Sequence, residues 1–195
     1  MERTETYRNL YHGTDEESAE KILKEGFKPS KSDRSWCGAG VYFYDIKAKA
    51  WWSANRTSNR IKEQYGRSVK PAVICADIFD LPIKYILDLR ADRNLRQFEK
   101  WVNDFLPKNS CLEVDNATTE EEKIINLRSM ILDFYASKIK AKLVVGMFQQ
   151  RKQKEHEYMI EFANNWMMVF GVETIYCVKD REILSNIEKG GKRNG

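Results

Sequence analysis

Hydrophobic and polar residues follow two spacings along the first two thirds of the chain, and each spacing predicts one kind of element. Alternation with a period of two, or a short apolar run bounded by turn residues, is typical of strands, whereas apolar residues three and four positions apart are typical of helices. Strands are predicted for 7–12, 38–44, 71–79 and 83–89. Helices are predicted for 16–25, 46–64, 93–105 and 120–139, the first beginning after the N-cap Asp15 and ending at Gly26.

The last third of the chain contains mostly short strands. They are predicted for 142–148, 157–163, 166–171 and 173–180, and a closing helix is predicted for 181–189. This order favours an α+β fold with a mostly antiparallel sheet and flanking helices. At 195 residues, the chain is expected to form a single domain, 1–195, with a helical insertion at about 92–139.

Composition indicates the cellular location of the protein and the state of its cysteines. The apolar runs are shorter than the roughly 18 residues of a membrane helix, and the N-terminal residues lack the apolar segment of a secretory signal. A cytoplasmic protein is therefore expected. The four cysteines are far apart and form no CxxC pair, so free thiols and no metal site are expected at Cys37, Cys75, Cys111 and Cys177.

The net charge is only +4, but the basic residues are concentrated in two segments. Residues 47–70 contain seven Lys or Arg against one acid, Glu63, and residues 138–154 contain six with no acid. Such segments are most often solvated faces of helices and loops. The alternative is a surface for a polyanion. Trp51 and Trp52 lie within the first segment, and basic residues with interleaved aromatic rings suit a single-stranded nucleic acid.

His12, one of two histidines, ends the first predicted strand directly before Gly13 and Thr14. A lone histidine at a strand end is most often a partly buried structural residue. Here a helix and a serine-containing loop lead from it to "GAGVYFY", where two glycines precede an aromatic strand. The two strand ends offer an imidazole and unshielded backbone on one side and the phenol ring of Tyr42 on the other. A flat heteroaromatic ligand with an amide and ribose hydroxyls would fit between them.

Together these pieces resemble a known family. "YHGT", the helix end "ILKEGF", the serine-containing loop and "GAGVYFY" span Leu10 to Tyr44. Their order and spacing are similar to the NAD-binding half of the ADP-ribosyltransferase superfamily, in the His-Tyr-Glu branch that includes diphtheria toxin and the poly(ADP-ribose) polymerases. The resemblance is clear over the first quarter of the chain and faint over the last. It implies the ADP-ribosyltransferase fold, with a split sheet, and NAD as the substrate.

The resemblance also assigns roles to individual residues. His12 would hydrogen-bond a ribose hydroxyl of NAD, and Tyr42 would stack on the nicotinamide ring. Gly13 would bind the nicotinamide carboxamide through its backbone, and any side chain there would project towards the amide or strain the turn. A second aromatic residue from the following helix, Trp52 or Trp51, would complete the stacking. The implied NAD-binding set is His12, Gly13, Thr14, Gly40, Tyr42 and Trp52.

The family's third motif residue is an acid on a late strand, where a carboxylate stabilises the oxocarbenium-like ribose as nicotinamide leaves. "GVETIYCVKD" resembles that strand, and alternation places Glu173, Ile175 and Cys177 on one face. Aligned on "VKD", the family's Glu would fall at Ile175, two residues beyond Glu173. The implied catalytic residues are Glu173, His12 and Tyr42, with Glu161 and Glu157 as the other candidate carboxylates.

The resemblance therefore implies a mono-ADP-ribosyltransferase that transfers ADP-ribose from NAD to an intracellular protein or nucleic acid. The chain is similar in size to bacterial or phage toxins and defence effectors. This similarity implies an antitoxin or inhibitor protein as a further partner. Two alternatives remain. A catalytically inactive NAD- or ADP-ribose-binding module is favoured if Ile175 stands where the Glu belongs. An RNA 2′-phosphotransferase shares the fold and an HGT motif, although its further His and Arg motifs are not found here.

Overall fold

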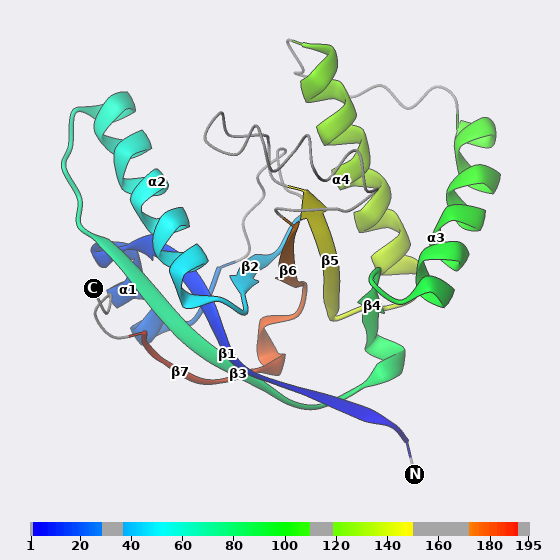
Figure 1. The fold of residues 1–195 in the computed structure, drawn as a ribbon, viewed down its shortest axis with the longest axis horizontal. Coiled ribbons are helices and arrows are strands. Elements are labelled where there is room, and N and C mark those ends of the chain that lie inside the picture. Colours follow the sequence, from blue (N-terminus) through cyan, green and yellow to red (C-terminus); the bar gives the residue numbers. More distant parts are fainter. Residues whose placement is uncertain (1, 29–36, 110–118, 150–171, 191–195) are drawn as a thin grey trace, which may run out of the picture.

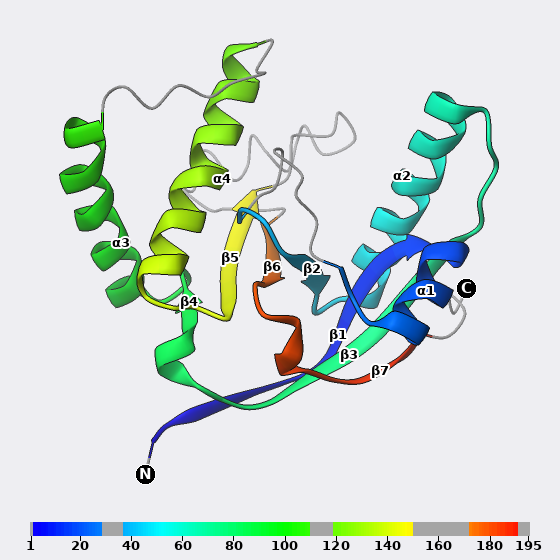
Figure 2. The same ribbon diagram turned by 180° about the vertical axis from the view of Figure 1, so that it is seen from behind.

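The computed structural model describes residues 2–28, 37–109, 119–149 and 172–190. Within these ranges, seven strands form one sheet in the order β4-β5-β6-β2-β1-β3-β7, with helices packed against it (Figures 1 and 2). Neighbouring strands are antiparallel except for β4 and β5, which are parallel. The predicted α+β class and the mostly antiparallel sheet are confirmed.

The elements follow the predicted spacing closely. The strands are β1 (Thr4–Asp15), β2 (Val41–Tyr44), β3 (Pro71–Pro82), β4 (Ile86–Asp88), β5 (Leu143–Gln149), β6 (Val172–Val178) and β7 (Leu184–Lys189). The α-helices are α1 (Glu16–Glu25), α2 (Lys47–Tyr65), α3 (Asp92–Phe105) and α4 (Glu120–Lys138). All four predicted helices are confirmed. The predicted N-cap of α1 is also confirmed, because the Asp15 carboxylate accepts a hydrogen bond from the Ser18 N–H at 2.9 Å.

The predicted closing helix at 181–189 is wrong. Only Arg181–Ile183 forms a short 3-10 turn, and the rest is strand β7, which pairs with β3 at the edge of the sheet. Its apolar residues Leu184 and Ile187 pack against the core, so tertiary pairing overrides the local helical spacing. The strands predicted for 157–163 and 166–171, with Glu157 and Glu161, lie outside the described residues.

The core occupies both sides of the sheet. Along β2, Val41 and Phe43 point to the side on which α1 packs. Tyr42 and Tyr44 point to the other side, where Tyr42 joins a cluster built with α3 and α4, and Tyr44 joins a cluster built with α2. Strand β2 therefore runs between α2 and α4, which rise from the same face of the sheet (Figure 1).

None of the described helices is long and apolar enough to cross a membrane. Three of the four cysteines, Cys37, Cys75 and Cys177, are buried free thiols, as predicted, and Cys111 lies outside the described residues.

Candidate functional site

The sheet divides between β1 and β2. These strands pair at one position, Tyr11 with Tyr44. Beyond it, β1 continues beside β3 as far as Asp15, while β2 stays against β6 as far as Val41. We call this divergence, with His12–Gly13 on its β1 side, the fork. A strand that leaves its neighbour presents backbone groups to whatever occupies the space between them.

The backbone of Gly13 points into the fork. Val73 lies opposite Gly13 on β3, and its C=O points away from β1, where it accepts a hydrogen bond from the Gly190 N–H at 2.7 Å. One residue beyond the ends of these two strands, the Glu16 N–H donates to the Lys70 C=O at 2.9 Å. Opposed residues alternate between bonded and non-bonded pairs in an antiparallel ladder. The Gly13 N–H and C=O therefore face β2, where they can bind an amide as one strand binds the next.

The missing side chain of Gly13 serves the packing of α2. A Cβ at Gly13 would lie 2.0 Å from the Ala50 carbonyl oxygen and 2.7 Å from the Ala54 nitrogen. Ala50 and Ala54 are both completely buried. The expectation that a side chain at Gly13 would project towards a ligand amide is therefore wrong, because it would run into the backbone of the helix.

His12 bridges the fork. Its Nδ1 lies 2.8 Å from the Tyr42 carbonyl oxygen, and because a carbonyl can only accept, Nδ1 carries the proton. Burial lowers the pKa of His12, and the bond to the Tyr42 carbonyl opposes that shift. In the neutral ring, Nε2 is then a hydrogen-bond acceptor, which suits a hydroxyl donor.

The His12 ring and the Tyr42 ring lie on opposite sides of the sheet. The imidazole packs edge-on against Phe27, with ring centroids 5.3 Å apart, and beside Phe43 at 5.8 Å. Tyr42 instead packs in the cluster with α3 and α4. The two residues meet through the backbone carbonyl of Tyr42 rather than through their rings, so the fork joins the two sides of the sheet.

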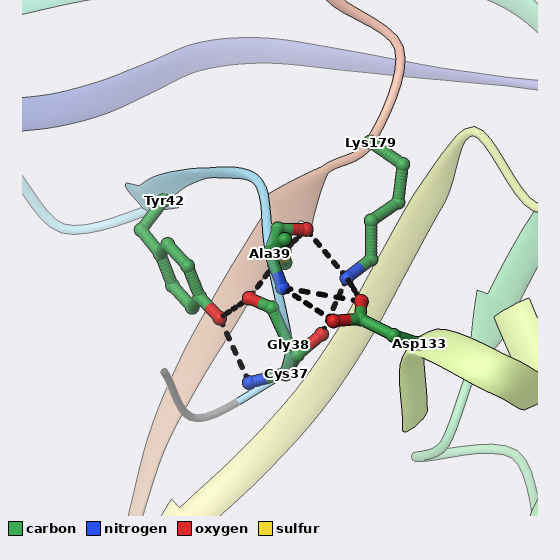
Figure 3. Close-up of polar contacts among 7 residues, drawn as sticks. Cys37, Gly38, Ala39, Tyr42, Asp133 and Lys179 are labelled. Atoms are coloured by element: carbon green, nitrogen blue, oxygen red, sulfur yellow. Dashed lines mark hydrogen bonds and ion pairs between the residues drawn. The ribbon is translucent and has the colours of Figure 1, made fainter. Parts of the chain in front are cut away.

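The hydroxyl of Tyr42 is bound to the turn that precedes β2. It accepts from the Cys37 N–H at 2.9 Å and donates to the Gly38 C=O (Figure 3). These hydrogen bonds fix the orientation of the phenol ring and engage its hydroxyl group.

Lys179, directly after β6, ties the same turn to the rest of the fold. Its ammonium donates to the Cys37 C=O at 2.6 Å, to the Ala39 C=O at 2.7 Å and to the Asp133 carboxylate of α4 at 2.7 Å (Figure 3). The Asp133 carboxylate also accepts from the Ala39 N–H at 2.9 Å. The turn, β6 and α4 are therefore joined by one network of hydrogen bonds.

Lys179→Met is expected to lower the free energy of unfolding by about 2 kcal/mol, because two carbonyls and a carboxylate lose a shared donor. The matched control is Lys189→Met, whose ammonium forms an exposed pair with Glu16 at 3.3 Å and should change stability by less than about 0.5 kcal/mol. Urea unfolding measures both. Equal effects of the two substitutions would contradict the structural role of Lys179.

Glu173 lies near the start of β6, and its side chain is 11% exposed. Its carboxylate pairs with the Lys49 ammonium of α2 at 2.5 Å. Burial raises the pKa of Tyr44, a hydrogen bond with Ser53 opposes the rise, and the nearby Glu173 carboxylate adds to it. A carboxylate, an ammonium and a phenol therefore gather where α2 passes the end of β2.

The two tryptophans of α2 have different surroundings. Trp51 packs with Tyr11 and Tyr44 in the cluster beneath the helix. Trp52 is 46% exposed, and the Arg56 guanidinium lies over its ring, 5.4 Å from the centroid. Among the described contacts, neither indole packs directly against Tyr42, and the stacking role of Trp52 or Trp51 stays a prediction.

The two remaining residues of the implied NAD-binding set, Thr14 and Gly40, lie in tightly packed positions. Thr14 is 8% exposed on β1. A Cβ at Gly40 would lie 2.5 Å from the Cys177 sulfur, and its φ of +157° is one that side chains rarely adopt. Gly40 therefore allows the turn before β2 to pack closely on β6.

The structure thus brings together the backbone of Gly13, the imidazole of His12 and the carbonyl of Tyr42, and places Glu173 on the Tyr42 side of the sheet. Tyr44 stands two residues after Tyr42 in the same alternation but was not predicted as a site residue. The ion pairs of Lys49 and Asp133 were not predicted either, because an ion pair between distant segments has no local signal.

Comparison with known proteins gives one relative. No family model matches the chain, and no solved structure matches it significantly. An uncharacterized protein of Methanocaldococcus jannaschii, MJ0359, is 41% identical to it in an alignment of 78 residues that covers 37% of this chain and 36% of that protein. The chain therefore matches little more than a third of that relative's length.

Proposed function

We propose that the protein is a mono-ADP-ribosyltransferase that uses NAD as its substrate. The observation that carries the proposal is the fork, where the N–H and C=O of Gly13 and a neutral histidine lie beside an aromatic strand. This arrangement offers separate groups for an amide and for a ribose hydroxyl. The sequence resemblance over Leu10 to Tyr44 supports the same assignment.

The nicotinamide carboxamide would bind to the N–H and C=O of Gly13. These two groups point away from β3 into the fork, so they can donate to the amide oxygen and accept from the amide nitrogen. Such a pair recognises an amide and discriminates against a carboxylate, because the C=O of Gly13 would repel the second oxygen.

The ribose would be oriented by His12. Its Nδ1–H is committed to the Tyr42 carbonyl, so Nε2 is the acceptor that remains for a ribose hydroxyl. The ring packs against Phe27 and Phe43, which also contact each other, and this packing fixes the direction of the acceptor.

Glu173 would supply the negative charge for the reaction. In the transfer, the bond between C1′ of the ribose and the nicotinamide nitrogen breaks, and nicotinamide leaves with the bonding electron pair. The acceptor atom then bonds to C1′ and releases its proton to solvent. The positive charge that develops on the ribose is stabilised by a fixed carboxylate, and Lys49 holds the Glu173 carboxylate in place.

Two observations favour a second function, a module that binds NAD or ADP-ribose without transferring it. The Glu173 carboxylate is already paired with Lys49, and Ile175, where the alignment on "VKD" would place the acid, is 2% exposed. Titration of NAD with simultaneous assay of free nicotinamide separates the two functions. Multiple turnovers support the transferase, whereas saturable binding with no release supports the module.

Two substitutions of His12 test its role in the fork. His12→Asn keeps an N–H near the position of Nδ1 but removes Nε2, whereas His12→Ala removes both and leaves a space beside Phe27. Loss of one hydrogen bond to the ribose should weaken NAD binding about tenfold in both variants. Only His12→Ala should also lose stability, by about 2 kcal/mol or more.

Calorimetric titration with NAD and urea unfolding give the two readouts for His12. NAD affinity that stays at the wild-type value in His12→Asn would contradict the assignment of Nε2.

A further inference from the structure

One face of α2 carries a row of cationic side chains, and this row extends along the helix away from the fork. Ala50, Ala54 and Ser58 are buried against the sheet, so the opposite face of the helix is the outer one. Residues three, four and seven positions apart share a face of a helix. We call the row of Lys49, Trp52, Arg56, Asn59 and Arg60 on this outer face the α2 stripe; Glu63, on the same face, lies one turn beyond Arg60.

The α2 stripe begins at the candidate site. Lys49 pairs with Glu173, and the charge of Arg56, two turns further on, lowers the pKa of Tyr44 against the larger effect of burial. From Lys49 to Arg60 the stripe runs about 16 Å along the helix, at a rise of about 1.5 Å per residue. A ligand that follows the stripe would therefore reach Glu173.

The cations of the α2 stripe beyond Lys49 are not neutralised. Among the described residues, no carboxylate pairs with Arg56, Arg60 or the neighbouring Lys62. On α1, by contrast, the exposed Lys21 pairs with Glu17 at 2.9 Å. Unpaired surface cations in a row provide positive potential for a polyanion rather than stability for the fold.

The α2 stripe also contains a stacking surface. Trp52 is 46% exposed, and the guanidinium of Arg56 lies 5.4 Å from its ring centroid. Exposed aromatic rings and guanidinium planes stack on unpaired bases, while neighbouring cations bind phosphates. A duplex would bury its bases, and a protein acceptor would require neither feature.

We propose that the α2 stripe binds single-stranded nucleic acid and that this strand is the acceptor of ADP-ribose. The inference rests on the proposed function, because the stripe leads to Glu173. It names the acceptor class, which the fork alone does not specify.

The first test measures binding of fluorescent single-stranded DNA and RNA oligonucleotides to the wild-type protein over a range of salt concentrations. Each phosphate contact should contribute about −0.7 to the slope of log K against log salt. Charge reversal at Arg56 and Arg60, to Glu, should weaken binding by at least tenfold. Binding that is independent of salt would overturn the inference.

The second test measures transfer from labelled NAD to the same oligonucleotides. Arg56→Glu/Arg60→Glu should lose at least nine tenths of the labelling but keep nicotinamide release into water. The matched control is Arg93→Glu/Lys100→Glu, which makes the same change in net charge on exposed positions of α3 and should label normally.

The outcomes of the second test distinguish the two proposals. Unchanged labelling of the oligonucleotides by Arg56→Glu/Arg60→Glu would overturn the α2 stripe as the acceptor surface. So would incubation of the wild type with a cell lysate, if only protein became labelled. Absence of nicotinamide release by the wild type would instead overturn the function on which it rests.

Discussion

Glu173→Gln is expected to lower the rate of nicotinamide release from NAD by about two orders of magnitude or more, with little change in the Kd for NAD. The substitution keeps the shape of the side chain and removes its charge. A fixed charge that acts on the developing oxocarbenium ion stabilises the transition state more than the ground state, so its loss affects the rate rather than the binding. Steady-state nicotinamide assays and calorimetric titration with NAD measure the two quantities.

Two further variants separate a catalytic role of Glu173 from its ion pair. Lys49→Met breaks the pair but leaves the carboxylate, so it should stay within about tenfold of the wild-type rate. Glu188→Gln removes an equal charge from an exposed position of β7, which β3 separates from β1, and should have no effect. If Lys49→Met and Glu173→Gln reduce the rate equally, Glu173 acts only as the partner of Lys49.

Gly13→Ala is expected to destabilise the fold by about 3 kcal/mol, at the upper end of the usual cost of overpacking. The new methyl group would lie 2.0 Å from the Ala50 carbonyl oxygen. Because that atom belongs to the helix backbone, no change of side-chain rotamer relieves the contact, and α2 must move away from β1. Urea unfolding measures the loss of stability.

The matched control is Gly66→Ala at the end of α2. Gly66 has a φ of +66° and no atom within 4 Å of the position of a Cβ, so its substitution costs only backbone strain, about 1 kcal/mol. Equal stability losses in the two variants would show that α2 does not pack on Gly13 as closely as described.

Local patterns predicted the elements well because most of them bury an apolar face. The alternation over "GAGVYFY" gave β2 with Tyr42 on one side, and the helical spacing of 46–64 gave α2 nearly to the residue. The edge strand β7 was missed because its sequence also fits a helix, and only its pairing with β3 decides between the two. Edge strands receive their conformation from a neighbour rather than from their own residues.

The candidate site was predictable in its residue types but not in its geometry. His12, Gly13 and Tyr42 were identified from local sequence, but the fork that connects them depends on how four strands pair. The Lys49–Glu173 pair joins residues far apart in sequence, and no pattern within either segment indicates it. The opposite orientations of the His12 and Tyr42 rings likewise follow from the register of β1 and β2, which pairs Tyr11 with Tyr44 and places His12 on the Phe43 side.

The most direct test of the proposed transferase activity is to incubate the protein with NAD labelled in its adenylate phosphate and with a total cell lysate, and to measure covalent label in macromolecules. Digestion with protease or nuclease then shows which class carries it. We predict that the wild type transfers label with equal release of nicotinamide, and that Glu173→Gln transfers almost none. Saturable NAD binding by the wild type with neither nicotinamide release nor covalent label would contradict a transferase and identify a binding module.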